Sequence, residues 1–370
     1  MFRDSNRTVF ILGAGASWHY GYPTGEALVG KIIEKAEIAL RYFTHSAKIK
    51  NPERPEFVTD AQQWMKAMEE TTRLRIGLEQ VNPLVIDYYL GWNPDVQAIG
   101  RLLIAWVILE CEQLSKHSNI NRYPKSNSTV NTTKYYDDWV RFIIHQIAIH
   151  CKESSDLLQN RVSFVTFNYD VSLETKLRNG LDHIQLFSKD DISKFLSGRV
   201  IHIYGKIRDE HAKSNDIPWA VQEHDPKQFG KVGDYHMQMK HLLDAVYNAS
   251  KGLRVIDPHD KAADDTEIMI ARKIIADANR VFILGYGFDE HNSGRLNLRE
   301  YLFKTAAAQV DKRILFTNYQ DINQINKRAS NLFYGMRTVF QPGGDAIVDR
   351  YEKSIRNTYD ALAMDFDLAD

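Results

Sequence analysis

The sequence predicts an α/β fold: a parallel sheet with helices on both faces and a large all-helical insertion. Two apolar runs that end in Gly-x-Gly support this fold class, VFILGAG at residues 9–15 and VFILGYG at residues 281–287. Such a run, bounded by turn residues, is typical of a buried strand in a parallel sheet. Strands alternate with helices at both ends of the chain, and a helical block separates them, so one sheet interrupted by an insertion is expected.

Each predicted strand is a short apolar segment. We expect strands at 8–12, 161–167, 200–204, 280–285, 313–317 and 337–341. Helical spacing predicts helices from the cap Thr24 to Phe43, throughout most of 61–160, and at 234–249, 264–279, 293–305 and from about 345 onward. The predicted domains are therefore a Rossmann-like nucleotide-binding domain at 1–43 and 161–370, and a helical insertion at 44–160.

Composition is that of an ordinary globular chain of 370 residues, 44% hydrophobic and 26% charged, with a formal net charge of −1. This charge gives no bulk field that would recruit nucleic acid or an anionic membrane. The sequence has neither a spanning apolar run of about 18 residues nor a signal-peptide pattern, so we expect a cytoplasmic protein. Cys111 and Cys151 form no Cys-x-x-Cys motif, and no metal site is expected from thiolates.

The first glycine-rich turn, Gly13-Ala14-Gly15-Ala16-Ser17, follows a strand and precedes a helix. Backbone N–H groups in such a turn can cradle a pyrophosphate. The dehydrogenase fingerprint is incomplete, because Trp18 stands where its third glycine would fall. A plain tight turn is the alternative interpretation. If both glycine turns lie at the carboxyl edge of one sheet, they form one nucleotide site.

Polar residues end two further strands. Asn168 and Asp170 follow the strand at 161–167, where a ligand would lie, although Asp170 as a cap for the next helix is the plainer interpretation. His202 and Tyr204 stand two apart, so both are predicted to point to one face, and Gly205 follows them. His202 is a candidate base; the alternative is a core histidine whose hydrogen bonds are satisfied.

Taken in order, these motifs resemble the sirtuin-like family of NAD-consuming enzymes, and in particular the sirtuin-like domains of bacterial antiphage defence systems. The matching segments are 13–17, Asn168 with Asp170, 202–205, 285–288 and Thr317-Asn318, and the segment 86–90 is similar to one in their helical insert. Two departures stand out. Tyr204 occupies the place of the family's histidine, and the zinc cysteines of deacylating sirtuins are missing.

The resemblance implies an NAD+ hydrolase that cleaves the nicotinamide–ribose bond to give ADP-ribose and nicotinamide, with NAD+ as substrate and no metal. Asn168 would orient the ribose and the water, Asp170 would accept a hydrogen bond from the carboxamide, and His202 with Tyr204 would activate the water or a ribose hydroxyl. Cofactor binding is assigned to Gly13, Ala14, Gly15 and Ser17 at the pyrophosphate, to Gly285, Gly287 and Asn318 at the adenosine end, and to Gly205 and Phe288.

The same resemblance implies antiphage defence by NAD+ depletion, with regulation by homo-oligomerisation or by a HerA-like hexameric ATPase. Nucleic acid would be reached only through such a partner, and no membrane is involved. The helical block, with Trp64, Trp92, Trp106 and Trp139, is a candidate assembly surface, unless these tryptophans are core. Two other functions stay open: an NAD-dependent protein deacylase, and a sensor that binds NAD+ or ADP-ribose without turnover. A dehydrogenase is disfavoured by the incomplete fingerprint.

Overall fold

A six-stranded parallel sheet in the order β3-β2-β1-β4-β5-β6 confirms the predicted α/β fold. The computed structural model describes residues 7–48, 54–117, 139–208, 232–255, 265–304, 312–318, 322–333 and 346–351. This strand order is the one found in Rossmann folds. The strands are β1 Thr8–Leu12, β2 Val162–Thr166, β3 Val200–His202, β4 Arg280–Leu284, β5 Lys312–Thr317 and β6 Ala346–Tyr351.

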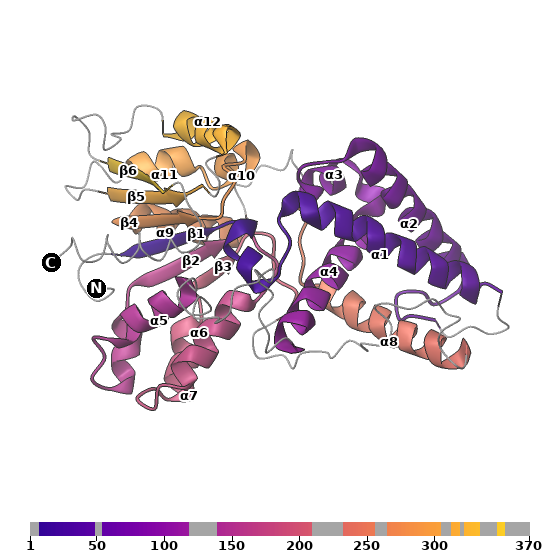
Figure 1. Cartoon of the computed structure of the whole chain (residues 1–370), viewed down its shortest axis with the longest axis horizontal. Helices are drawn as coiled ribbons and strands as arrows, with labels where there is room; N and C mark the ends of the chain where they lie inside the picture. The colour runs from indigo at the N-terminus through magenta and orange to yellow at the C-terminus, as the bar shows by residue number, and fades with distance from the viewer. Residues whose placement is uncertain are drawn as a thin grey trace, which may run out of the picture.

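Strand β1 lies at the centre of the sheet and brings the two ends of the chain together (Figure 1). It pairs in parallel with β4, and Leu12 stands opposite Leu284. The two glycine turns that follow these strands therefore lie side by side at one carboxyl edge, as predicted. The strand order reverses between β1 and β4, and open α/β sheets bind ligands at that switch point.

Helices cover both faces of the sheet. One face packs Phe10, whose ring centroid lies 5.4 Å from that of Phe164 and 5.0 Å from that of Phe282, against α5 Trp139–Ala148, α6 Ser172–Asp182 and α7 Lys189–Leu196. The other face packs Val9 and Ile11 in one core with α9 Thr266–Asp277, α11 Leu298–Lys304 and α12 Asn323–Leu332. The short α10 Glu290–Arg295 follows the second glycine turn.

A second lobe consists of helices alone (Figure 1). It contains α1 Gly25–Ser46, α2 Ala61–Val81, α3 Ile86–Trp92, α4 Gln97–His117 and α8 Val232–Ser250. The sequence division had placed α1 and α8 with the sheet, within 1–43 and 161–370, and α5 within the insertion 44–160. The structure corrects this, because α1 packs on α2 and α4, α8 packs on α4, and α5 packs on α6.

The tryptophans of the predicted assembly surface divide into two groups. Trp64, Trp106 and Trp139 are buried core residues, and only Trp92 is exposed, with 57% of its surface accessible. A large aromatic side chain in a helical block most often serves packing, and this interpretation holds for three of the four. Among the described residues, no helix combines the length and the apolarity that crossing a bilayer requires.

The C-terminal prediction is wrong in one respect. A helix was expected from about residue 345, but Ala346–Tyr351 form strand β6, which pairs in parallel with β5. Pairing with the open edge of β5 outweighs a weak helical spacing, because strand formation depends on context. The strand expected at 337–341 lies outside the described residues.

Candidate functional site

The two glycine turns contact each other directly. The N–H of Gly13 donates to Leu284 O, and the N–H of Gly15 donates to Gly285 O, each at 3.0 Å. A Cβ on Gly15 would lie 2.8 Å from Gly285 Cα, and Gly285 has a φ of +58°, which favours glycine. The repeated sequence motif is therefore one structural unit, in which each turn requires the glycines of the other.

This contact reduces the number of backbone N–H groups in the first turn that are available to a pyrophosphate. The N–H groups of Gly13 and Gly15 bind the second turn, while those of Ala16 and Ser17 bind Gly13 O and Ala14 O in a 3-10 turn. Among the hydrogen bonds of the described residues, only the N–H of Ala14 within 13–17 has no acceptor. A second 3-10 turn, Trp18–Tyr20, separates this segment from α1, so the α1 terminus does not follow the turn directly.

Asn168 joins the end of β2 to the first glycine turn. Its side-chain Nδ2 donates to Gly13 O at 3.1 Å and to Ser17 Oγ at 2.9 Å, and Ser17 also hydrogen-bonds to Asp170. Because Gly13 O can only accept, the amide nitrogen must face the turn, and the amide oxygen Oδ1 points elsewhere. Four predicted site residues from segments about 150 residues apart thus form one network.

Asp170 interacts with the start of α6 as well as with the network around the first glycine turn. It is buried, and its Oδ1 accepts from the N–H of Ser172 at 3.0 Å and from the Ser172 hydroxyl at the start of α6. Burial raises the pKa of Asp170, and the hydrogen bonds from Ser172 and Ser17 oppose that shift. The N-cap position of α6 is Val171, so Asp170 is not the cap residue itself; it accepts hydrogen bonds from the first residue of α6 and also contacts the first glycine turn.

His202 is held at both ring nitrogens. Nδ1 lies 2.9 Å from Asn168 O, and Nε2 lies 2.8 Å from Oε1 of Glu174 on α6. Burial lowers the pKa of His202, but the Glu174 carboxylate outweighs burial and raises it; burial raises the pKa of Glu174, and His202 outweighs that and lowers it. A backbone carbonyl and a carboxylate both accept hydrogen bonds, so this geometry favours an imidazolium that donates from both ring nitrogens.

The predicted role of His202 as a base does not fit this geometry. An imidazolium that donates from both nitrogens has no lone pair to accept a proton. His202 instead fixes the backbone carbonyl of Asn168, so it positions the residue at the centre of the network. Glu174 was missed by sequence reasoning. The available signal was an acidic residue on the buried face of α6, beside Leu173 and Leu177.

Tyr204 does not act together with His202. Strand β3 ends at His202, and residues 203–204 form a turn, so the alternation that predicted a shared face does not extend to Tyr204. Its ring packs against Phe167 and Tyr169, and its hydroxyl donates to Asn292 Oδ1. Burial raises the pKa of Tyr204 well above its ordinary value, which keeps it a neutral phenol.

The predicted cofactor-binding residues beyond the first turn have mostly structural contacts. Gly205 has a φ of +71° and forms a bridge to Leu253, which docks the turn on the segment after α8. Phe288 is buried and packs on Tyr286, Phe316 and Phe333. Asn318 Nδ2 donates to Ile322 O at 3.0 Å and to Asn326 Oδ1 at 2.7 Å. By contrast, a Cβ on Gly287 would meet open space, so a ligand can approach the second turn there.

A cavity of about 650 Å³ lies beside β3 and touches two predicted site residues, His202 and Gly205, together with Lys206 and Arg254. The described residues contain no cluster of three or more His, Cys, Asp or Glu side chains suited to a metal ion, and Cys111 and Cys151 are not joined by a disulfide. In comparisons with known proteins, the chain matches no family model, no curated protein and no solved structure. Function must therefore be inferred from the site.

Proposed function

We propose that this protein binds NAD+ at the carboxyl edge formed by its two glycine turns and hydrolyses the nicotinamide–ribose bond. The observation that supports this most is the Asn168 side chain, which bridges Gly13 and Ser17 at the switch point of the sheet. Because Nδ2 faces the turn, Oδ1 is directed away from it, and we expect Oδ1 to meet a ligand bound at this edge.

The chemistry suits a site that positions groups rather than transfers protons. The nicotinamide of NAD+ leaves as a neutral base, so its departure needs no general acid. Water oxygen bonds to ribose C1′ while the C1′–N bond breaks, the bonding electron pair passes to the pyridinium nitrogen, and the surplus proton passes to solvent. The protein must hold the water and stabilise the electron-poor ribose.

Within this scheme, Asn168 Oδ1 accepts a hydrogen bond from the water or a ribose hydroxyl. Its Nδ2 is held by Gly13 and Ser17, and its carbonyl is held by His202. Such a residue is fixed at three points before substrate binds, which lowers the reorganisation needed during the reaction. Asp170 supplies a buried acceptor for the nicotinamide carboxamide, as the resemblance implies.

The cellular role that we propose is NAD+ depletion in antiphage defence. An enzyme of this kind must be inactive in a healthy cell, so its activity requires control by self-assembly or by a partner such as a HerA-like ATPase. The exposed Trp92 on α3 is the one tryptophan of the helical block that remains accessible for such a contact.

A binding module without turnover is the second candidate, and one observation favours it. Neither residue assigned to water activation has a free proton acceptor, because His202 is doubly bound and Tyr204 stays a phenol. A sensor needs the same dinucleotide site but no activated water. It would bind NAD+ or ADP-ribose and return it unchanged.

The decisive experiment measures products by chromatography after incubating purified full-length protein with NAD+. We expect nicotinamide and ADP-ribose without any acylated peptide, and a loss of at least about 100-fold in Asn168→Ala. Asn331→Ala on α12, the same change at an exposed residue outside the cavity beside β3, serves as the matched control and should keep the wild-type rate.

Two results would overturn the hydrolase, and a third would overturn the proposed site. Turnover that appears only with an acyl-lysine peptide would show a deacylase. Tight NAD+ binding with no product from wild type or from any variant would show the sensor. Equal rates in wild type and Asn168→Ala would show that the reaction occurs elsewhere in the protein.

A further inference from the structure

Helix α3 of the helical lobe is tied to the sheet by two phenol–carboxylate hydrogen bonds. Tyr169, at the end of β2, donates its hydroxyl to Asp87 of α3. The next residue of α3, Tyr88, donates its hydroxyl to Asp289, which follows the second glycine turn. The exchange is reciprocal, since α3 and the sheet edge each supply one phenol and one carboxylate. Hydrogen bonds to a carboxylate are stronger than those between neutral groups.

These two bonds flank the proposed site. Tyr169 stands between Asn168 and Asp170, and Asp289 caps α10 by accepting from the N–H of Asn292 at 2.9 Å. The Tyr88 ring also packs edge-on against the ring of His291, with 4.9 Å between centroids. Helix α3 therefore contacts the segments that follow β2 and β4, on either side of β1, next to the switch point where the dinucleotide would bind.

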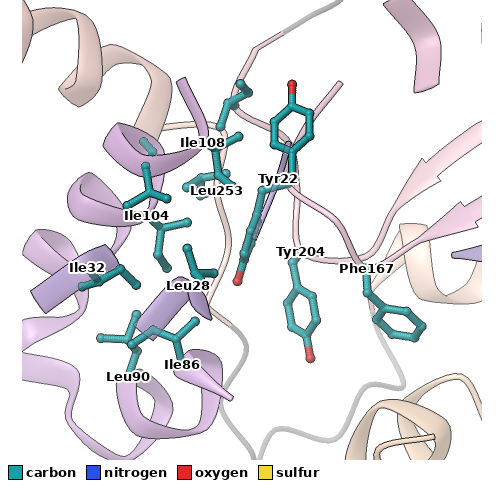
Figure 2. Packing of buried hydrophobic residues seen from close by; sticks show 14 of the residues in the cluster. Tyr22, Leu28, Ile32, Ile86, Leu90, Ile104, Ile108, Phe167, Tyr204 and Leu253 are labelled. Atoms are coloured by element: carbon teal, nitrogen blue, oxygen red, sulfur yellow. The ribbon is translucent and has the colours of Figure 1, made fainter. Parts of the chain in front are cut away.

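The side chains of the proposed site are almost entirely buried. Asn168 is 9% exposed, Asp170 5%, His202 7% and Tyr204 2%. Figure 2 shows Tyr22 and Tyr204 beside a group of aliphatic side chains from the helical lobe, among them Leu28, Ile86 and Leu90, with Phe167 on the far side of Tyr204. A dinucleotide that contacts Asn168 needs this apolar contact between the lobes to open first.

We propose that α3 is a latch that holds the dinucleotide site closed through the pairs Tyr169–Asp87 and Tyr88–Asp289. This inference rests on the proposed function for the identity of the ligand. Ligand that binds only the open state is weakened in proportion to the small open fraction. A partner or a second copy that draws α3 away from the sheet would then switch the protein on without any change at Asn168.

The test compares Tyr88→Phe with Tyr89→Phe in the full-length protein. Tyr88→Phe removes one latch bond and keeps the ring against His291. Tyr89→Phe removes the neighbouring hydroxyl, which lies against Gly77 of α2 inside the helical lobe and does not reach the sheet. Hydrogen–deuterium exchange at 83–92 and 166–170 measures opening, calorimetry measures NAD+ binding, and chromatography measures nicotinamide release.

For Tyr88→Phe we expect about tenfold faster exchange in both segments and about tenfold tighter NAD+ binding, because one charge-assisted hydrogen bond is lost from the closed state. Tyr89→Phe should match wild type in exchange rate and in NAD+ binding.

Faster exchange and tighter binding without nicotinamide release would support the latch and overturn the hydrolase. Faster exchange with no NAD+ binding in any variant would support the latch but contradict the assigned ligand. Exchange in Tyr88→Phe within twofold of both wild type and Tyr89→Phe would overturn the latch, provided that a thermal melt shows a folded variant.

Discussion

The two glycine turns share a sequence motif and a place in the sheet, yet their surroundings differ. Around the first turn are polar groups, with Ser17 and Asn168 in one network backed by Glu174 and His202. Around the second turn are aromatic rings, with Tyr286 stacked on Phe167 at 5.0 Å. The shared motif supplies the close backbone approach, and the neighbouring strands and helices decide what each turn can do.

This difference assigns separate tasks to the two sides. The first turn is suited to hold a ligand, because its side chains offer oriented acceptors. The second turn is suited to support and close the site. Its aromatic rings fill the core, and Asp289 accepts a hydrogen bond from the Tyr88 hydroxyl of the helical lobe. Variants that damage one side and spare the other test whether the division is real.

The largest change in unfolding free energy is expected near the first glycine turn, at the buried pair Glu174–His202. Glu174→Ala leaves the buried His202 without its counter-ion, and removing one partner of a buried ion pair lowers the free energy of unfolding by about 3–5 kcal/mol. Urea denaturation of the variant against wild type measures this loss. A loss below about 1 kcal/mol in unfolding free energy would show that the pair does not stabilise the region around the first turn.

The pH dependence of that loss identifies the charges. The pKa of His202 is raised, so its contribution is complete below its ordinary value of 6.5 and disappears as pH rises through the raised value. The pKa of Glu174 is lowered, so its contribution is complete above 4.5 and disappears as pH falls through the lowered value. The difference between wild type and Glu174→Ala should therefore be greatest between pH 4.5 and 6.5 and shrink above that window. A difference that stays constant from acid to alkaline pH would contradict an ionised pair.

The next effect falls on the contact between the turns. Gly285→Ala puts a Cβ into the backbone of Gly15 and Ala16 at a positive φ, and we expect a loss of about 3 kcal/mol in unfolding free energy. Gly287→Ala, in the same turn, meets open space and should change stability by less than about 0.5 kcal/mol. Thermal or urea denaturation distinguishes the two. Equal losses of unfolding free energy in the two variants would show that the glycine at 285 is not required by the close contact between the two turns.

A smaller effect with the opposite sign is expected where the helical lobe meets the sheet. Burial raises the pKa of Asp87 from 3.8 to about 6, so its stabilising contribution is complete below 3.8 and lost as pH rises to about 6. Asp87→Asn keeps an acceptor for Tyr169 and removes the buried charge. We expect the variant to be more stable than wild type by about 1–2 kcal/mol at pH 8, and equal or less stable at pH 4. Denaturation curves at both pH values check this, and a variant less stable at pH 8 would contradict it.

Strands β1 to β5 could be predicted from sequence because each is an apolar run next to a turn signal, whereas β6 could not, because it depends on pairing with the edge of β5. The meeting of Ser17 with Asn168 followed from the same pattern, since parallel strands end at a common edge. Other features depend on tertiary contacts that no local pattern contains. The spacing of α1 shows that it has a buried face but not that α2 and α4 cover it.

The predicted roles of single residues failed for a related reason. His202 was predicted to be a base because the sequence does not show that Glu174 binds it. Glu174 lies 28 positions earlier, on a helix whose orientation the sequence does not reveal. Asn318 looked like a ligand contact, but its amide serves Ile322 and Asn326. A polar residue at a strand's end marks the edge where a site can form, and only the folded chain shows which of those residues remain available.

The most direct measurement is nicotinamide release from NAD+ by Tyr88→Phe, beside the double variant Tyr88→Phe with Asn168→Ala. An opened site with an intact first turn should release nicotinamide faster than wild type, and the double variant should lose that activity by at least about 100-fold. If the double variant releases nicotinamide as fast as Tyr88→Phe, Asn168 does not form the site, and the division of labour between the two turns is wrong.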